Sequence, residues 1–303
     1  MTGEAASGCV LAADIGGTRA RFALGRDGAL RDAAEFAVAD FSDPVAALAA
    51  YLDACGRPVL QAAALAIAAP VGDGEEAVLT NGHWRFRRNA LARELDLSIG
   101  RVRLVNDFHA LAAALPTLGP DDTRAVGGVV GGVAGAVVDA AMAVLGPGTG
   151  LGVAGLVPGR AGWEVVVGEG GHVTLAPDDA RESAILDLAR RQFGHVSAER
   201  LLSGTGLPLL HELAARVDGR PVILASEIST PDLVAAALAG DADCRSTVDT
   251  FCAWLGSVAG NVALSFGARG GVYIGGGIVP RLGSMFDASG FRARFEAKGR
   301  LNG

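Results

Sequence analysis

Two adjacent polar residues, Asn106 and Asp107, have side chains that suit acid–base chemistry. They stand between an apolar run and a helix-forming run. Residues 101–105 are rich in valine and leucine, which predicts a short buried strand. Residues 108–115 are strong helix formers, and Pro116 ends that pattern. Ligands of open α/β sheets bind at the carboxyl ends of strands. We therefore expect Asp107 to be a general base; the alternative is that it only caps the following helix.

Two glycine-rich turns have types and spacing that suit phosphate. One covers residues 16–18 and the other residues 146–150, and each joins two apolar strands. Glycine N–H groups can point at phosphate oxygens, and Thr18 or Thr149 adds a hydroxyl donor. Asp14, beside the first turn, is placed to hold Mg²⁺ through water. Either turn alone is more often a simple tight turn, but the pair favours a clamp on a polyphosphate.

A second group of polar residues suits a neutral polyhydroxyl ligand. Carboxylates, an amide and an imidazole together can donate and accept many hydrogen bonds. His172 alone would more often be a packed structural histidine. The group consists of Asn106, Asp107, Glu169, His172 and Glu199.

The elements that position these residues form two similar series. The first has strands at 9–15, 19–24, 29–37, 61–69 and 101–105, with helices at 44–55, 89–95 and 108–115. The second has strands at 141–145, 151–157, 163–167 and 271–274, with helices at 181–193 and 247–266. Ala20, Phe22 and Leu24 should point inward, and residues 80–84 look polar and exposed. The sequence thus predicts an α/β protein with two βββαβα-type domains, residues 1–116 and 117–303, around a cleft.

Composition narrows the classes of partner. The net charge is −7 and no block of lysine and arginine occurs, which argues against nucleic acid or an anionic membrane. The four cysteines are scattered, so neither a disulfide framework nor a zinc site is expected. We therefore expect a protein of the reducing cytoplasm. Residues 1–8 lack the pattern of a signal peptide. The apolar segment 125–157 is interrupted by glycines and Asp139, which favours a buried strand over a membrane span.

Seven motifs, in order and at matching spacing over nearly the whole chain, resemble those of the bacterial glucokinase family. They are Asp14-Ile15-Gly16-Gly17-Thr18-Arg19-Ala20-Arg21, Thr80-Asn81-x-x-Trp84, Asn106-Asp107-Phe108, Leu145-Gly146-Pro147-Gly148-Thr149-Gly150-Leu151-Gly152, Glu169-Gly170-Gly171-His172, Glu199-Arg200-Leu201-Leu202-Ser203-Gly204 and Gly271-Val272-Tyr273-Ile274-Gly275-Gly276-Gly277.

This resemblance implies the actin-like ATPase (ribonuclease H-like) fold and phosphorylation of D-glucose at its 6-hydroxyl by ATP with Mg²⁺. It assigns Asp107 as the catalytic base, and Asp14 keeps the role of a water-mediated magnesium ligand inferred above. The sugar-binding residues it implies are Asn81, Asn106, Asp107, Glu169, His172 and Glu199. The nucleotide-binding residues it implies are Ala13, Asp14, Ile15, Gly16, Gly17, Thr18, Gly148, Thr149, Gly150, Gly275, Gly276 and Gly277. The expected partners are glucose and ATP, and a homodimer is left open.

The chain departs from the family pattern in two places. Arg19 stands where the family usually has asparagine. Family members also continue past residues 298–300 through a strand and a helix that return to the first domain, so uncovered apolar surface is expected there.

Other functions stay open at this point. A kinase of another hexose is the nearest, although the cysteine-rich zinc motif of the sister sugar kinases is absent. A sugar-sensing regulator would need an N-terminal DNA-binding helix pair, and the first strand already begins at Cys9. An actin-fold ATPase with a protein partner is disfavoured by the polar group described above.

Overall fold

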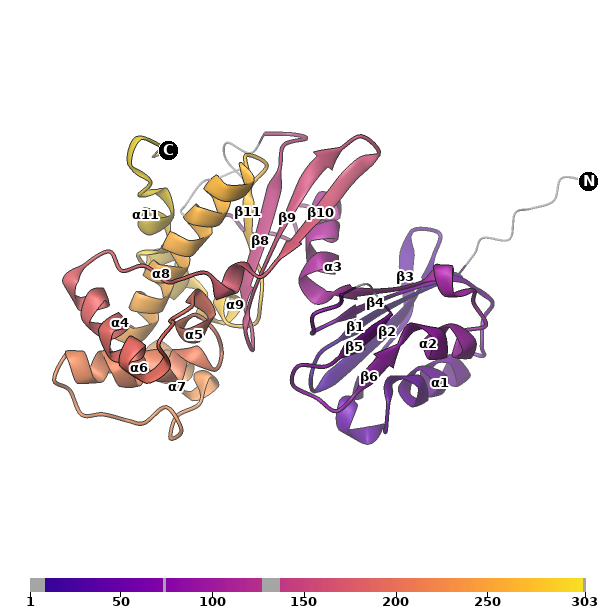
Figure 1. Ribbon diagram of the computed structural model, residues 1–303, viewed down its shortest axis with the longest axis horizontal. Coiled ribbons are helices and arrows are strands. Elements are labelled where there is room, and N and C mark those ends of the chain that lie inside the picture. The colour runs from indigo at the N-terminus through magenta and orange to yellow at the C-terminus, as the bar shows by residue number, and fades with distance from the viewer. Residues whose placement is uncertain (1–8, 73–74, 127–136, 302–303) are drawn as a thin grey trace, which may run out of the picture. The chain divides into compact units, whose positions relative to one another are not determined.

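The computed structural model describes residues 9–72, 75–126 and 137–301 (Figure 1). The expectation for residues 1–8, and parts of those for the loop at 72–74 and the segment 125–157, lie outside this range. The chain divides into two compact units, residues 1–110 and 111–303. The division lies within α3, a few residues before the position expected from the sequence.

The first unit is built on a five-stranded sheet. Its strands are β1 (Cys9–Ile15), β2 (Arg19–Arg26), β3 (Ala29–Ala37), β4 (Leu60–Ile67) and β7 (Val102–Asn106), and the helices of this part are α1 (Pro44–Ala54), α2 (Arg88–Glu94) and α3 (Asp107–Ala114). The strand order is β3-β2-β1-β4-β7, with β1 antiparallel to β2 and parallel to β4. Ala20, Phe22 and Leu24 are at most 2% exposed, which confirms the predicted inward face of β2. This core fixes the edge where β1, β4 and β7 end.

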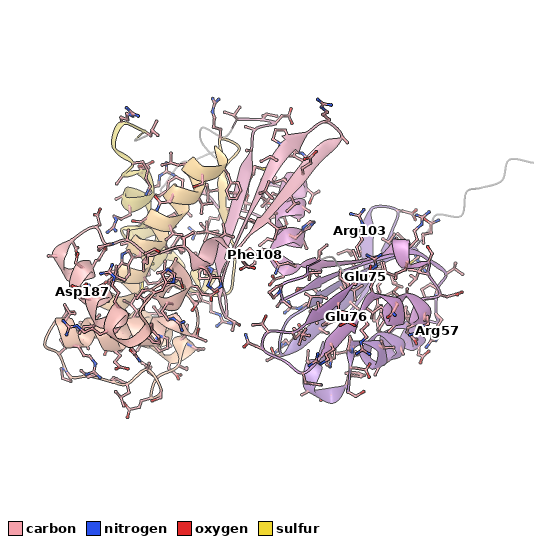
Figure 2. The ribbon with its side chains drawn as sticks, in the orientation of Figure 1. Arg57, Glu75, Glu76, Arg103, Phe108 and Asp187 are labelled. Atoms are coloured by element: carbon pink, nitrogen blue, oxygen red, sulfur yellow. The ribbon has the colours of Figure 1, made fainter. Side chains whose placement is uncertain are left out.

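Helix α1 shows how local signals set an element. Asp43 accepts a hydrogen bond from the Ala46 amide at 2.9 Å, and Pro44 occupies the first turn. Gly56, just past the end, has a φ of +73°, which glycine tolerates without cost. The predicted start and end of this helix are confirmed. Arg57, which forms an ion pair with Asp53, lies on the surface of this unit, and Asp187, which pairs with Arg190, lies on the surface of the second (Figure 2).

The expectation that residues 80–84 form an exposed segment is wrong at one residue, Trp84. A hairpin of two short strands, β5 (Glu76–Val78) and β6 (Arg85–Arg87), encloses them. Trp84 is fully buried, and its indole N–H donates to the Phe41 carbonyl at 3.1 Å. The prediction failed at Trp84 because its large ring packs in the core, whereas residues 80–83 are exposed as expected.

The second unit repeats the opening of the first. Its sheet contains β8 (Met142–Pro147), β9 (Leu151–Gly159), β10 (Gly162–Gly168) and β11 (Val272–Ile274). The strand order is β10-β9-β8-β11, with β8 and β9 antiparallel and β8 and β11 parallel. This matches β3-β2-β1-β4, so the predicted repeat is confirmed.

Helices fill the stretch between β10 and β11. They are α4 (Ala180–Phe193), α5 (Ala198–Leu201), α6 (Gly206–Val217), α7 (Thr230–Leu238) and α8 (Ala242–Phe266), followed after β11 by α9 (Val279–Leu282), α10 (Ser284–Ala288) and α11 (Phe291–Glu296). Helix α8 is buried along much of its length and packs on α11, α7 and α6 (Figure 1). It begins five residues before the predicted start, because Asp241 caps it by accepting from the Cys244 amide. No helix in the described part of the chain is long and apolar enough to cross a membrane.

Candidate active site

In the first unit, parallel pairing brings three strand ends to one edge. Ile15 of β1 pairs with Ile67 of β4, and Ile67 pairs with Asn106 of β7. Strands β1 and β7 are therefore two interstrand spacings apart, about 10 Å. Asp14 and Asp107 stand at this edge, and the charge of Asp14 acts on Asp107.

Asn106 and Asp107 both contact the backbone at the start of α3. The Asn106 side-chain oxygen accepts a hydrogen bond from the Phe108 amide at 2.9 Å, as a helix N-cap does. Its side-chain amide donates to the Ala69 carbonyl at 3.1 Å. Asp107 shares the Phe108 amide at 3.0 Å. Asn106 therefore occupies the cap position, and both side chains accept from the same backbone amide.

The environment of Asp107 favours proton acceptance. Burial raises the pKa of this carboxyl above 3.8, and the nearby negative charge of Asp14 raises it further. The Phe108 amide and Asn106 oppose that rise by stabilising the charged form. A carboxylate with a raised pKa is a stronger base than an exposed one, which is what general base catalysis requires.

The first glycine turn packs against the loop that carries Asn81. A Cβ on Gly17 would lie 2.4 Å from the Asn81 carbonyl oxygen, so only glycine fits there. The predicted residues Gly17 and Asn81 are thus neighbours, and Thr18 is exposed beside them. Ala13 and Ile15 are buried in β1, so only their backbone can face a ligand.

Charged side chains surround Asp14. Its carboxylate accepts from Arg21 at 3.1 Å, and Arg21 also donates to Glu35 of β3 at 2.8 Å. Arg19, the residue that departs from the family pattern, pairs with the same Glu35. Arg19 is therefore held by β3.

The chain's residues fit a magnesium ion that arrives with a nucleotide. Within the described ranges, no group of three or more histidine, cysteine or carboxylate side chains is arranged to hold a metal by itself. Mg²⁺ usually keeps several waters and binds through one or two carboxylates plus substrate phosphates. The Asp14 side chain is 58% exposed at the strand edge, which suits such a role.

In the second unit, Glu199 lies directly against the second glycine turn. One of its oxygens accepts from the Leu151 amide at 2.8 Å. A Cβ on Gly150 would lie only 2.3 Å from that oxygen. By contrast, a Cβ on Gly148 would meet nothing within 4 Å. The turn therefore has one closed side, filled by Glu199, and one open side.

His172 completes a group with two carboxylates. Its Nε2 atom is 3.7 Å from Glu199 and 4.0 Å from Glu169. The side chain of His172 is 58% exposed and that of Glu169 is 74% exposed, so the alternative of a packed structural histidine is wrong. Gly171 positions this segment, because a Cβ there would lie 2.0 Å from the Leu151 carbonyl oxygen. The predicted residues of the second unit are thus brought together.

The third glycine run, residues 275–277, packs backbone to backbone on the end of β8. The Gly275 amide donates to the Leu145 carbonyl at 2.9 Å. Gly276 has a φ of +81°, and a Cβ there would lie 2.4 Å from the Pro147 carbonyl oxygen. Both facts require glycine. The second and third runs therefore lie side by side.

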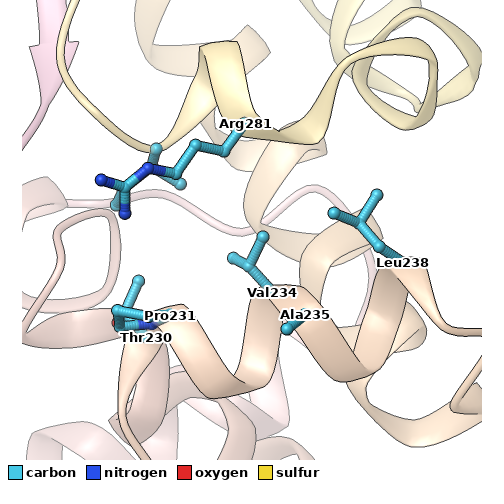
Figure 3. A pocket seen from close by; sticks show the side chains of 7 residues that line it. Thr230, Pro231, Val234, Ala235, Leu238 and Arg281 are labelled. Atoms are coloured by element: carbon cyan, nitrogen blue, oxygen red, sulfur yellow. The ribbon is translucent and has the colours of Figure 1, made fainter.

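An apolar pocket of about 200 Å³ adjoins the end of the third run (Figure 3). Val234, Ala235 and Leu238 of α7 form one wall, and Arg281 of α9 reaches across from the other (Figure 3). Ile278, which follows Gly277, also lines it. An apolar slot beside a glycine run that suits phosphate has the chemistry to hold a flat base.

This pocket, and the segment that joins it to the second turn, were not predicted from the sequence. Ser229, Thr230 and Pro231 form a helix-start signal that could have revealed α7. No pattern could have paired Thr230 with Gly204, because their hydrogen bond spans 26 residues.

Comparison with known proteins agrees with this geometry. The glucokinase family model matches residues 11–303. A glucokinase from Chromobacterium violaceum is 47% identical over 96% of this chain and 81% of its own length. A crystal structure of glucokinase from an Antarctic psychrotroph is 35% identical, with a TM-score of 0.83 over 97% of this chain and 90% of that one.

A more distant structure shares the fold alone. It is a ROK family glucokinase from Streptomyces griseus in complex with glucose and AMPPNP, 19% identical, with a TM-score of 0.61 over 95% of this chain and 90% of that one. The predicted actin-like ATPase fold is confirmed by these neighbours. The match over nearly the whole length shows that this chain belongs to the glucokinase family.

Proposed function

We infer that this chain is an ATP-dependent glucokinase, which transfers the γ-phosphoryl group of ATP to the 6-hydroxyl of D-glucose. Membership of the family supports the reaction. The observation that carries it is the position of Glu199, which touches the glycine turn and stands 3.7 Å from His172. Groups suited to a sugar and groups suited to phosphate thus adjoin in one unit.

Asp107 is the proton acceptor in this proposal. Phosphoryl transfer to a hydroxyl releases a proton, which a positioned carboxylate can accept as the new bond forms. The raised pKa of Asp107 makes it a better base, and the cap provided by Asn106 holds the backbone at its position.

The glycine turns hold the triphosphate. Gly16, Gly17 and Thr18 of the first unit and Gly148, Thr149 and Gly150 of the second supply backbone N–H groups and hydroxyl donors. The pocket beside Ile278 takes the adenine ring. Asp14 would hold Mg²⁺ through water, and the bound ion would neutralise phosphate charge.

The sugar is held by hydrogen bonds to its hydroxyls. We propose that Glu169, His172 and Glu199 of the second unit, and Asn81 and Asn106 of the first, make these bonds. The Streptomyces griseus neighbour, which shares the fold, carries glucose and an ATP analogue, and we extend those ligands to this chain. We also propose a cytoplasmic location, where ATP is made, and the homodimer stays a prediction that light scattering can check.

A coupled ADP-release assay over a panel of hexoses and phosphoryl donors tests the function. We expect the highest kcat/KM with D-glucose and ATP, and a product phosphorylated at carbon 6 by nuclear magnetic resonance. A higher kcat/KM for another hexose or an N-acetylated sugar would make this chain a different sugar kinase. ATP hydrolysis that no sugar stimulates would exclude the proposal.

A further inference from the structure

The wall of the apolar pocket is tied to the second glycine turn by two consecutive hydrogen bonds. The Thr230 hydroxyl donates to the Gly204 carbonyl at 2.5 Å. The Gly204 amide donates to the Gly148 carbonyl at 2.7 Å. Gly204 has no room for a side chain, because a Cβ would lie 2.9 Å from that same carbonyl oxygen. The three residues therefore form a closely fitted chain from pocket to turn.

Among the described residues, few other hydrogen bonds hold the segment around Gly204 against the second glycine turn. The Thr205 hydroxyl reaches the Thr149 carbonyl at 3.4 Å, a long contact from an exposed residue. Ser203 is fully buried, but its hydroxyl accepts from the Gly206 amide and so serves the start of α6. The Thr230 bond is the short one that joins Gly204 to a different helix, α7.

We propose that Thr230 is a positioning residue for nucleotide binding, which sets the second glycine turn relative to the base pocket. Thr230 begins α7, and Ser229 caps that helix by accepting from the Asp232 amide, so the hydroxyl starts from a fixed backbone. Through the Gly204 peptide it fixes the Gly148 carbonyl. A triphosphate must reach the turn while its base occupies the pocket, so the spacing between them decides affinity. This inference rests on the proposed use of ATP.

A second feature of the turn makes it dependent on outside support. Gly148 has nothing within 4 Å of its Cβ position, so no side chain packs it from that direction. Its amide bonds within the turn, to the Gly150 carbonyl at 2.8 Å, and its carbonyl is the atom that Gly204 holds. Loss of the Thr230 bond should therefore loosen the open side of the turn, whereas the Gly150 side stays fixed by Glu199.

Thr230→Val and Thr230→Ser test the proposal, because valine keeps the shape and serine keeps the hydroxyl. Calorimetry would measure binding of ATP and of adenosine, which carries the base without phosphate. We expect Thr230→Val to weaken ATP by roughly three- to tenfold, the worth of one hydrogen bond, and to leave adenosine unchanged. Thr230→Ser should restore ATP affinity. Thr250→Val is the matched control, since Thr250 also donates to a backbone carbonyl, that of Ser246 at 2.9 Å, but on α8; its ATP affinity should equal wild type.

The outcomes separate this inference from the function on which it rests. Equal weakening of ATP and adenosine by Thr230→Val would show that the hydroxyl only contacts the base, and would overturn the proposal. Unchanged ATP affinity, or equal loss in Thr250→Val, would overturn it as well. Because binding is measured without turnover, a wild-type chain that binds ATP but phosphorylates no sugar would reject the proposed function and still leave the Thr230 result decisive.

Discussion

The two units share one strand order, yet different groups surround their glycine turns. In the first unit, Gly17 lies against the backbone of Asn81, and carboxylates stand at the strand edge. In the second, Gly150 lies against the Glu199 carboxylate, which in turn stands near His172. The comparison shows that two units with the same architecture can have different roles. Under our proposal, the first unit accepts the proton, and the second holds most of the sugar and the nucleotide base.

The largest effect should come from the first unit. Asp107→Asn keeps the shape and most hydrogen bonds but removes the base, so kcat should fall by on the order of 10²–10⁴. The ADP-release assay measures it. Asp96→Asn is the matched control, because Asp96 is exposed and its φ of +52° suits asparagine. Near wild-type turnover in Asp107→Asn would remove the first unit's assigned role.

Within the second turn, two glycines should respond differently. Gly148→Val has space in the protein but places a branched side chain where phosphate approaches, so ATP binding should weaken by about 1.5–3 kcal/mol while glucose binding stays. Gly150→Ala would instead displace the Glu199 carboxylate and weaken glucose binding too. Calorimetry with each ligand separates the two. If Gly148→Val reduced both affinities equally, the turn would be merely architectural.

Sugar contacts in the second unit should have effects of similar or smaller size. Glu169→Gln or His172→Gln should reduce kcat/KM for glucose by roughly 1–3 kcal/mol, because a buried hydroxyl would lose its partner. The loss should shrink for the deoxyglucose that lacks the matching hydroxyl. His195→Gln, another exposed histidine of this unit, should match wild type. Equal losses on every deoxyglucose isomer would indicate a structural role.

The smallest effects concern stability, and their signs are opposite in the two units. Burial raises the pKa of Asp107, so its stabilising contribution is present below pH 3.8 and is lost as the pH rises through the folded value. Asp107→Asn should therefore raise Tm at pH 7, with the gain vanishing in acid. Thermal denaturation as a function of pH would show this, and a lower Tm at pH 7 would contradict it.

His211, in the core of the second unit, gives the opposite case. It is 2% exposed and bonds the Thr247 hydroxyl at 2.8 Å, and burial lowers its pKa below 6.5. The unfolded chain then binds the proton first, so stability should fall as the pH drops below about 6.5 toward the folded value. His211→Asn, which can keep one donor, should make Tm less sensitive to pH in that range. An unchanged slope would show that other groups dominate.

Much of the fold was predictable because its signals are local. The alternation in β2, the cap of α1 and the two hairpins with glycine turns are read from neighbouring residues. Short elements could not be predicted, because β5 and β6 have three residues each, too few for a period to show. Trp84 between them was predicted to be exposed and is buried. The helices α5, α6 and α7 lie in a stretch for which no helical pattern was proposed.

The residues of the candidate site could be predicted from the sequence, but the contacts between them could not. Motif order identified Glu199, His172 and the glycine turns. It could not show that Glu199 fills the side of Gly150, because that contact depends on how α5 packs against β9. The start of α3 is a similar case: only the hydrogen-bond geometry shows that Asn106 and Asp107 both accept from the Phe108 amide.

The most direct test of these separate roles uses the variants Asp107→Asn and His172→Gln. Glucose is titrated into each by calorimetry, and kcat is measured on the same preparations. The account predicts that Asp107→Asn binds glucose about as tightly as wild type and barely turns over. It predicts that His172→Gln binds glucose more weakly and loses far less in kcat. If instead both variants lost binding and turnover in the same proportion, the two units would not have the separate roles assigned to them.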